Sequence, residues 1–236
     1  MMMTSKPTLV LLPGLGNNAR IWAAQVAEFS DEYTVVIPDY RVASSIDEMA
    51  DCLLQQVSAE RFSLVGYSLG GYIALNLIQK IPERIERLAF ISSSPYADSE
   101  QAIKQRKYII EAVTKDYNSA LNTLAKAVTY ADGVNTKSAR DTLSLMGQEL
   151  GAEVFCRHQE AVMQRPDCRS ILASINHRVA VLVGENDVVT PVSANQFLAD
   201  NIKGAAVHVI AKAGHLLPLE KPNEVTVFLR QWLALT

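Results

Sequence analysis

Short apolar stretches alternate with helix-like stretches along most of the chain. Continuous apolar strands that are separated by helices are typical of a parallel sheet covered on both faces. The pattern therefore predicts an α/β fold with a mostly parallel sheet of about six strands and helices on both sides. The predicted strands are Thr8 to Leu12, Thr34 to Ile37, Phe62 to Val65, Leu88 to Ile91, Val179 to Val183 and Val207 to Ile210.

The strand pattern stops between the fourth and fifth predicted strands. From Pro95 to about Leu172 no strand-like run occurs, whereas apolar positions recur at helical spacing. These positions are Leu121, Leu124, Ala125 and Val128; Leu143, Met146 and Leu150; and Phe155, His158 and Val162. The chain is therefore predicted to form a core from residues 1–94 and 173–236, with residues 95–172 inserted as helices. Helices at the carboxyl edge of a sheet cover the turns that end its strands.

Composition and charge narrow the class of protein. The chain has 236 residues, of which 49% are hydrophobic, enough for one large core. A net charge of -3 with scattered signs gives no basic surface for nucleic acid or anionic lipid. The apolar run Thr8 to Leu12 is too short for a signal peptide or a membrane span. We expect a cytoplasmic enzyme or binding protein that acts on a small molecule, without a nucleic-acid or membrane partner.

The cysteines point to neither a disulfide framework nor a zinc site. Cys52, Cys156 and Cys168 are odd in number and widely spaced, and no CxxC pair occurs. All three are expected to be reduced, with Cys52 in the core on the apolar face of a helix and Cys168 in a loop open to solvent. No metal ion or cofactor is expected.

A glycine-rich turn, Gly66-Tyr67-Ser68-Leu69-Gly70-Gly71, joins the third predicted strand to a helix. Such a turn can hold one side chain on a strained backbone at the sheet edge, provided that the flanking residues are small. Here that side chain is the Ser68 hydroxyl, and the Leu69 amide lies beside it at the helix N-terminus. A serine that merely caps the helix would give the same pattern, so other parts of the chain must decide.

The turn after the first strand supports two interpretations. Residues 14–19 match the GxGxxA fingerprint of dinucleotide-binding proteins, and Asp39 lies close to where a ribose-binding carboxylate would stand. Alternatively, the glycines bring backbone amides close to a reacting oxygen, and the Leu15 amide is then an oxyanion donor. Two prolines argue against a dinucleotide site: Pro13 precedes the first glycine, and Pro38 precedes Asp39. The chain also lacks a Tyr-x-x-x-Lys pair.

Two later turns place an acid and an imidazole at the same edge of the sheet as Ser68. Asp187 follows the fifth predicted strand, and His215 follows Gly214 in the loop after the last one. The order Ser, Asp, His is that of hydrolytic triads that carry a GxSxG turn. Glu185 is a weaker candidate for the acid.

Together these motifs resemble the α/β-hydrolase superfamily over nearly the whole chain. The motifs are Leu12-Pro-Gly-Leu-Gly, Gly66-Tyr-Ser-Leu-Gly-Gly, Gly184-Glu-Asn-Asp with Thr190-Pro191, and Gly214-His-Leu-Leu-Pro-Leu-Glu-Lys-Pro. The chain is most similar to the small, lidded, cofactor-free branch, which includes enol-lactone hydrolases, carbon-carbon bond hydrolases, carboxylesterases and perhydrolase-type haloperoxidases. It departs from many members in having Pro13-Gly14 in place of His-Gly, and Asp39-Tyr-Arg-Val-Ala-Ser-Ser in place of Asp-x-x-Gly-x-Gly-x-Ser.

The resemblance implies a role for each candidate residue. Ser68 would be the nucleophile, His215 the base and Asp187 the group that orients it, while the amides of Leu15 and Leu69 would form the oxyanion hole. It also implies that residues 95–172 are a helical cap. Because the chain begins at what would be the third strand of the family, the resemblance further implies a sheet trimmed to about six strands.

A serine nucleophile favours acyl transfer to water over displacement at saturated carbon. We therefore predict a hydrolase that cleaves an ester, lactone or thioester of a small, mainly apolar substrate through an acyl-Ser68 intermediate. A carbon-carbon bond hydrolase or lyase on the same fold, a slow-turnover ligand receptor and a dinucleotide oxidoreductase are alternatives. Arg20 and Arg41, near the first two turns, are candidates for binding a substrate carboxylate, but we expect them to be surface charges. The sequence does not indicate the oligomeric state. Candidates for the pocket wall are Tyr72, Tyr96, Tyr108, Tyr117, Phe155, Met163 and Leu216.

Overall fold

A computed structural model describes residues 6–234, so that positions 1–5 and 235–236 of the predicted core lie outside the described residues. Its six strands form one sheet in the order β2-β1-β3-β4-β5-β6, and all five ladders are parallel. The predicted sheet is thus confirmed. The strands are β1 (Thr8–Leu12), β2 (Thr34–Val36), β3 (Phe62–Tyr67), β4 (Ile85–Ile91), β5 (Arg178–Gly184) and β6 (Val207–Ile210).

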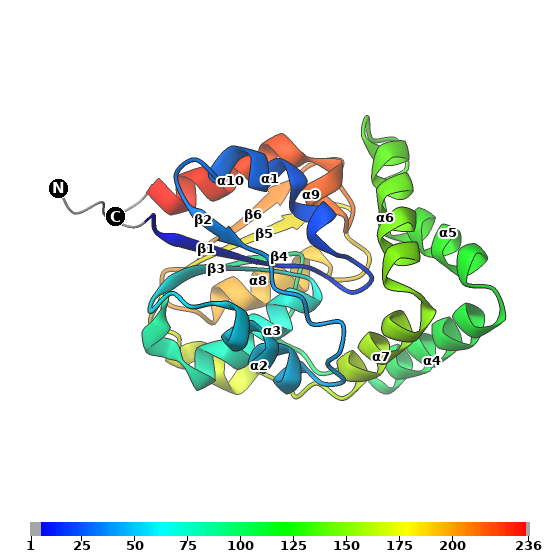
Figure 1. The fold of residues 1–236 in the computed structure, drawn as a ribbon, viewed down its shortest axis with the longest axis horizontal. Helices are drawn as coiled ribbons and strands as arrows, with labels where there is room; N and C mark the ends of the chain where they lie inside the picture. The colour runs from blue at the N-terminus through cyan, green and yellow to red at the C-terminus, as the bar shows by residue number, and fades with distance from the viewer. Residues whose placement is uncertain (1–5, 235–236) are drawn as a thin grey trace.

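Helices cover both faces of this sheet (Figure 1). One face carries α1 (Ala23–Phe29) and α10 (Pro222–Ala234), and the other carries α2 (Ile46–Gln56), α3 (Leu69–Lys80) and α8 (Val192–Asp200). Successive residues of a strand point to opposite faces, so Leu64 packs among the α2 and α3 side chains and Val65 among those of α1 and α10. Burial on both sides explains why β1 and β3 are continuous apolar runs.

Four helices are inserted between β4 and β5 and lie together at one end of the molecule (Figure 1). They are α4 (Glu100–Lys115), α5 (Tyr117–Val128), α6 (Thr136–Leu150) and α7 (Ala152–Met163). Side chains of Ser99 and Asp116 accept hydrogen bonds from backbone amides at the starts of α4 and α5, which fixes where these helices begin. A separate apolar cluster, built on Val113, Leu121 and Phe155, holds α4, α5 and α7 together. The buried side chains of α6 belong instead to the core cluster beside α1 and α10.

The segment that approaches the predicted boundary at residue 172 packs against the core. Cys168 is only 8% exposed, and Leu172, in the short helix η3 (Arg169–Ser174), packs in the cluster beside α2 and α3. The prediction of an exposed Cys168 is therefore wrong, because the returning segment is drawn against this face of the sheet. Cys52 is half-buried and packs against the same cluster.

Shorter elements complete the fold: η1 (Ala19–Trp22), η2 (Pro82–Arg84) and α9 (Leu217–Glu220). Within residues 6–234 no helix combines the length and the apolar character that a membrane span requires.

Candidate active site

Ser68 lies in the turn between β3 and α3, on a strained backbone. Its φ of 52° and ψ of -114° fall outside the regions that most side chains prefer. Two hydrogen bonds hold this geometry: the Ser68 amide donates to the Ile91 carbonyl at 3.0 Å, and the Ser93 hydroxyl donates to the Ser68 carbonyl at 3.0 Å.

The neighbouring positions must be glycine because other parts of the chain approach them closely. A Cβ atom at Gly66 would lie 2.6 Å from the Gly70 carbonyl oxygen, and one at Gly71 would lie 2.1 Å from the Ser93 hydroxyl oxygen. The strand and the helix therefore cross too closely for any larger residue. This packing presents the Ser68 side chain at the carboxyl edge of the sheet.

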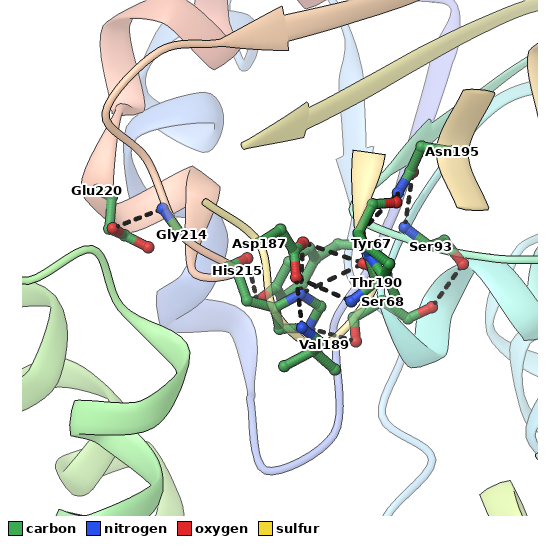
Figure 2. A network of polar contacts seen from close by, with 11 residues as sticks. Tyr67, Ser68, Ser93, Asp187, Val189, Thr190, Asn195, Gly214, His215 and Glu220 are labelled. Carbon is green, nitrogen blue, oxygen red and sulfur yellow. Dashed lines mark hydrogen bonds and ion pairs between the residues drawn. The ribbon is translucent and has the colours of Figure 1, made fainter. Parts of the chain in front are cut away.

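The side chains of Ser68, His215 and Asp187 form one continuous hydrogen-bonded chain (Figure 2). Ser68 Oγ lies 2.9 Å from His215 Nε2, and His215 Nδ1 lies 2.8 Å from Asp187 Oδ2. All three residues are buried, with exposed fractions of 9%, 6% and 4%. Because Nδ1 faces a carboxylate, it carries the proton, which leaves Nε2 free to accept the hydroxyl proton of Ser68.

Hydrogen bonds from the loop after β5 favour the ionised form of Asp187. Asp187 Oδ1 accepts hydrogen bonds from the amides of Val189 (2.9 Å) and Thr190 (2.8 Å), and Oδ2 accepts one from the Thr190 hydroxyl (3.0 Å). Burial opposes ionisation of the carboxyl group, but His215 and these donors outweigh it, so the pKa of Asp187 lies below its usual value. Glu185 is exposed and accepts a hydrogen bond from the Lys212 amide instead.

Asn195, which is fully buried, ties the acid loop to the turn that holds Ser68. Its Oδ1 accepts from the Ser93 amide at 3.1 Å, and its Nδ2 donates to the Thr190 carbonyl at 2.9 Å (Figure 2). The residues that position the acid and the hydroxyl are thus linked through a single side chain. Sequence analysis assigned no role to Asn195 or Thr190, although Thr190 lies within a motif that the family resemblance uses.

The imidazole loop is held by a second buried acid, Glu220, which sequence analysis also missed. Glu220 Oε2 accepts hydrogen bonds from the Gly214 amide (2.9 Å) and from the Tyr130 amide in the inserted segment (2.8 Å). Burial raises the pKa of Glu220, although these amides oppose the shift. The sequence signal that could have identified Glu220 is its position in the motif that begins at Gly214. Glu220 therefore joins the His215 loop to the inserted helices.

The backbone around His215 is fixed from two further directions. Its amide donates to the Val128 carbonyl at 2.8 Å, and its carbonyl accepts from the Tyr67 hydroxyl at 3.0 Å. The Tyr67 ring lies 5.5 Å from the imidazole ring, measured between centroids. Burial raises the pKa of Tyr67 well above its ordinary value, so this hydroxyl keeps its proton and acts as a donor.

The two predicted oxyanion donors lie beside the same cavity as Ser68. Leu69 is the first residue of α3, so its amide has no acceptor within the helix. Leu15 lies in the turn after β1, where Gly16 has a φ of 71°. Both leucines line the cavity with Ser68 and His215. Their role as oxyanion donors stays a prediction.

This cavity, of about 150 Å³, lies between the sheet edge and the inserted helices, and its wall is mainly apolar. The inserted helices contribute Arg106, Ile109, Leu121, Leu124, Val128, Leu143, Phe155, Gln159 and Val162. Of the residues that the sequence suggested for the wall, Tyr72, Phe155 and Leu216 line it.

The other suggested wall residues lie elsewhere. Tyr108 is 67% exposed on the outer face of α4, because the helical period turns Arg106 and Ile109 toward the cavity instead. Tyr96 packs against Phe197, with a centroid distance of 5.3 Å, beside a different and smaller cavity.

Tyr117 and Met163 are likewise absent from the residues that line the cavity beside Ser68. Tyr117 packs behind Phe155, and its hydroxyl donates to the Gly147 carbonyl at 2.7 Å. Met163 is the last residue of α7, where the helix ends.

The GxGxxA turn lies against the cavity beside Ser68, where Leu15 and Gly16 are part of the wall. Asp39 forms an ion pair of 2.6 Å with Arg41, and Arg20 forms one of 2.6 Å with Glu149. Both arginine side chains are about half exposed, at 55% and 52%. In the part of the chain that the structure describes, no group of three or more His, Cys, Asp or Glu side chains is placed to hold a metal ion.

Comparison with known proteins identifies the family of this chain. The model of the alpha/beta hydrolase family matches residues 9–227. The chain belongs to the alpha/beta hydrolase family. It is 27% identical to a Yersinia enterocolitica protein named "Putative carbamate hydrolase RutD", over 96% of this chain and 87% of that protein. It is 24% identical to the pimeloyl-[acyl-carrier protein] methyl ester esterase of Nitrosomonas europaea, over 92% of each chain.

A solved structure is also close to this alpha/beta hydrolase. A thermophilic esterase from Thermogutta terrifontis superposes with a TM-score of 0.87 and 25% sequence identity, covering 97% of this chain and 90% of that chain.

Proposed function

We propose that this alpha/beta hydrolase is a cytoplasmic serine esterase that cleaves a small, mainly apolar carboxylic ester through an acyl-Ser68 intermediate. The observation that carries the proposal is the buried chain of hydrogen bonds from Ser68 through His215 to Asp187, which opens onto an apolar cavity. Two of the similar proteins are named as esterases, and a third as a carbamate hydrolase, which supports acyl transfer to water as the reaction.

In the first half of the reaction, His215 Nε2 takes the hydroxyl proton while Ser68 Oγ attacks the ester carbonyl carbon. The resulting oxyanion accepts hydrogen bonds from the amides of Leu15 and Leu69. The imidazolium then gives its proton to the departing alkoxide, and the acyl group stays on Ser68. Asp187 holds the tautomer and stabilises the positive charge on the ring.

In the second half, a water molecule enters where the alcohol has left. His215 removes one of its protons as the water oxygen attacks the acyl carbon, and the same proton returns to Ser68 as the acid departs. The sum is one ester and one water giving one acid and one alcohol. Lactones and thioesters carry the same reacting carbonyl and follow the same steps.

The inserted helices α4 to α7 serve as a cap in this proposal. Their apolar side chains form most of the cavity wall and keep bulk water from the acyl group. The cavity volume of about 150 Å³ is that of a site that holds a molecule the size of benzene, so we expect a preference for acyl chains of about six carbons or fewer.

The proposal is tested with p-nitrophenyl esters of two to twelve carbons, assayed on the wild type and on Ser68→Ala. We expect the wild type to be most active on chains of about four to six carbons and much slower beyond eight. Ser68→Ala should lower kcat about a million-fold at every length. Turnover by Ser68→Ala within tenfold of the wild type would rule out the acyl-enzyme.

A further inference from the structure

One charged side chain interrupts the apolar wall that the cap presents to the catalytic cavity. Among the described residues that line this cavity, Arg106 is the only one from the Asp, Glu, Lys and Arg group. It lies in α4, one helical turn before Ile109, and its side chain is 20% exposed. A guanidinium in such a wall is costly unless its charge and its N–H groups find partners.

Protein groups satisfy only part of this guanidinium. Arg106 Nε donates to Asp98 Oδ2 at 2.5 Å, and Nη1 donates to Gln159 Oε1 at 2.6 Å. Within residues 6–234, no protein atom accepts a hydrogen bond from Arg106 Nη2 or from Gln159 Nε2. These two atoms are not among the unpartnered polar atoms that are fully buried. Gln159 is 3% exposed and also lines the cavity. Two unused donors thus belong to adjacent side chains in one wall.

Asp98, Arg106 and Arg165 form a cluster with one negative and two positive charges. Asp98 Oδ1 pairs with a second guanidinium, that of Arg165, at 2.7 Å, so one carboxylate serves two arginines. Asp98 and Arg165 side chains are 4% and 6% exposed, so solvent screens this cluster poorly. Arg165 also lies over the Tyr72 ring, 4.2 Å from its centroid. An anion that enters the cavity would balance the remaining charge.

We propose that Arg106 and Gln159 form a subsite for a carboxylate at the far end of the acyl chain, so that the substrate is a half-ester of a dicarboxylic acid. A carboxylate has two acceptor oxygens and accepts strong, charge-assisted hydrogen bonds from a guanidinium. The apolar wall between Ser68 and Arg106 suits the methylene chain that joins the two ends. The proposal rests on the esterase function proposed above and names its substrate class.

The test compares kcat/KM for two substrates of similar length: the mono-p-nitrophenyl ester of adipic acid and p-nitrophenyl heptanoate. The ratio of anionic to neutral substrate isolates the subsite from the chemistry, because both substrates carry the same leaving group. We expect the wild type to favour the anionic ester, and Arg106→Gln to lower the ratio about tenfold or more.

Gln159→Glu is the second variant, since it keeps the size of the side chain and the contact with Arg106. Its carboxylate would neutralise the guanidinium and repel the substrate anion, so the same fall in the ratio is expected. This variant decides the question if Arg106→Gln does not fold. Lys107→Gln is the matched control: it removes an exposed charge from the next position of the same helix and should leave the ratio unchanged.

Each outcome bears on one proposal or the other. Equal ratios in the wild type, Arg106→Gln and Gln159→Glu would overturn the carboxylate subsite while leaving the esterase intact. If the wild type hydrolyses neither substrate, the esterase proposal fails, and the thermal shift produced by adipate decides the subsite. A stabilisation of the wild type that Arg106→Gln lacks would support the subsite, and no stabilisation of the wild type would overturn it.

Discussion

The carboxyl edge of the sheet and the inserted helices build the two sides of one cavity by different means. At the sheet edge, backbone groups hold the candidate catalytic residues. The amides of Val189 and Thr190 bind the Asp187 carboxylate, the Ile91 carbonyl accepts from the Ser68 amide, and a Cβ atom at Gly66 would clash with the backbone of α3. The opposite wall is built from long side chains on helices, most of them apolar.

Under the proposed function, this difference gives the two regions separate tasks. Groups that move a proton must hold their geometry to within a fraction of an ångström, and backbone contacts provide that. Residues that select a substrate need only match its shape and charge. Substitution of side chains on the inserted helices can change this match without disturbing the sheet. Residues of the sheet edge should therefore control kcat, and residues of the cap should control substrate preference.

The largest expected effect lies at the sheet edge. Asp187→Asn should lower kcat about ten-thousand-fold, because the amide no longer holds the imidazole in the tautomer that accepts the serine proton. Steady-state kinetics on the preferred p-nitrophenyl ester measures the loss. Glu185→Gln, which changes an exposed acid on the same loop, is the control and should stay within threefold of the wild type. A larger loss for Glu185→Gln than for Asp187→Asn would reverse the assignment of the acid.

Two glycine substitutions compare the rigidity of the regions directly. In Gly66→Ala the new Cβ meets backbone atoms at 2.6 and 2.7 Å, and we expect a loss of about 3 kcal/mol or more in the free energy of unfolding. In Gly147→Ala, within α6, the new Cβ meets the ends of the flexible Leu121 side chain at 2.7 Å. Because alanine favours the helix, its net effect should stay within about 1 kcal/mol.

Urea denaturation of both variants provides these values. Equal losses in Gly66→Ala and Gly147→Ala would contradict the contrast between a rigid sheet edge and an adaptable cap.

A pH effect is expected where α7 meets the core. Burial lowers the pKa of His158 to about 4, and Arg157 adds to this, while the Tyr40 carbonyl and Asp39 oppose it. Since the unfolded chain binds the proton more tightly, the stability present above pH 6.5 is lost as the pH falls toward 4. At pH 5 the loss should be about 2 kcal/mol.

Urea denaturation of the wild type and of His158→Gln at pH 7.5 and pH 5 measures this effect. The variant should lose about 2 kcal/mol less than the wild type between the two pH values. An equal pH dependence in both proteins would show that His158 titrates normally in the folded state.

The smallest effect is expected from the apolar wall. Leu124→Ala removes part of a half-buried side chain that lines the cavity, so the preferred acyl chain should become about two carbons longer. The p-nitrophenyl ester series measures the shift. If the preferred chain length is unchanged and kcat falls at all chain lengths, the inserted helices affect the rate of the reaction and not the choice of substrate.

The sequence predicted the sheet well because its strands are buried on both faces and leave continuous apolar runs. It also predicted that Ser68, Asp187 and His215 would meet, since parallel strands end at one edge, and the structure brings them together. Their catalytic roles remain predictions. The supports of this network, Asn195 and Glu220, were not predicted, because each joins a nearby turn to a segment far away in the chain: Asn195 binds Ser93, and Glu220 binds Tyr130.

The inserted helices α4 to α7 were harder to predict. Helical spacing indicated which residues share a face, but not which face would look into the cavity. For that reason Tyr108 was placed in the wall, whereas Arg106 and Gln159 line it. The hydrogen bond between these two joins α4 to α7, and no local pattern in the sequence indicates it.

The central claim, an activated Ser68, is tested most directly by intact-mass analysis after treatment with a fluorophosphonate, which reacts with activated serine hydroxyls. The wild type and Ser68→Ala are treated in parallel at neutral pH. The account predicts one adduct on the wild type and none on Ser68→Ala. An unlabelled wild type, or equal labelling of both proteins, would contradict it.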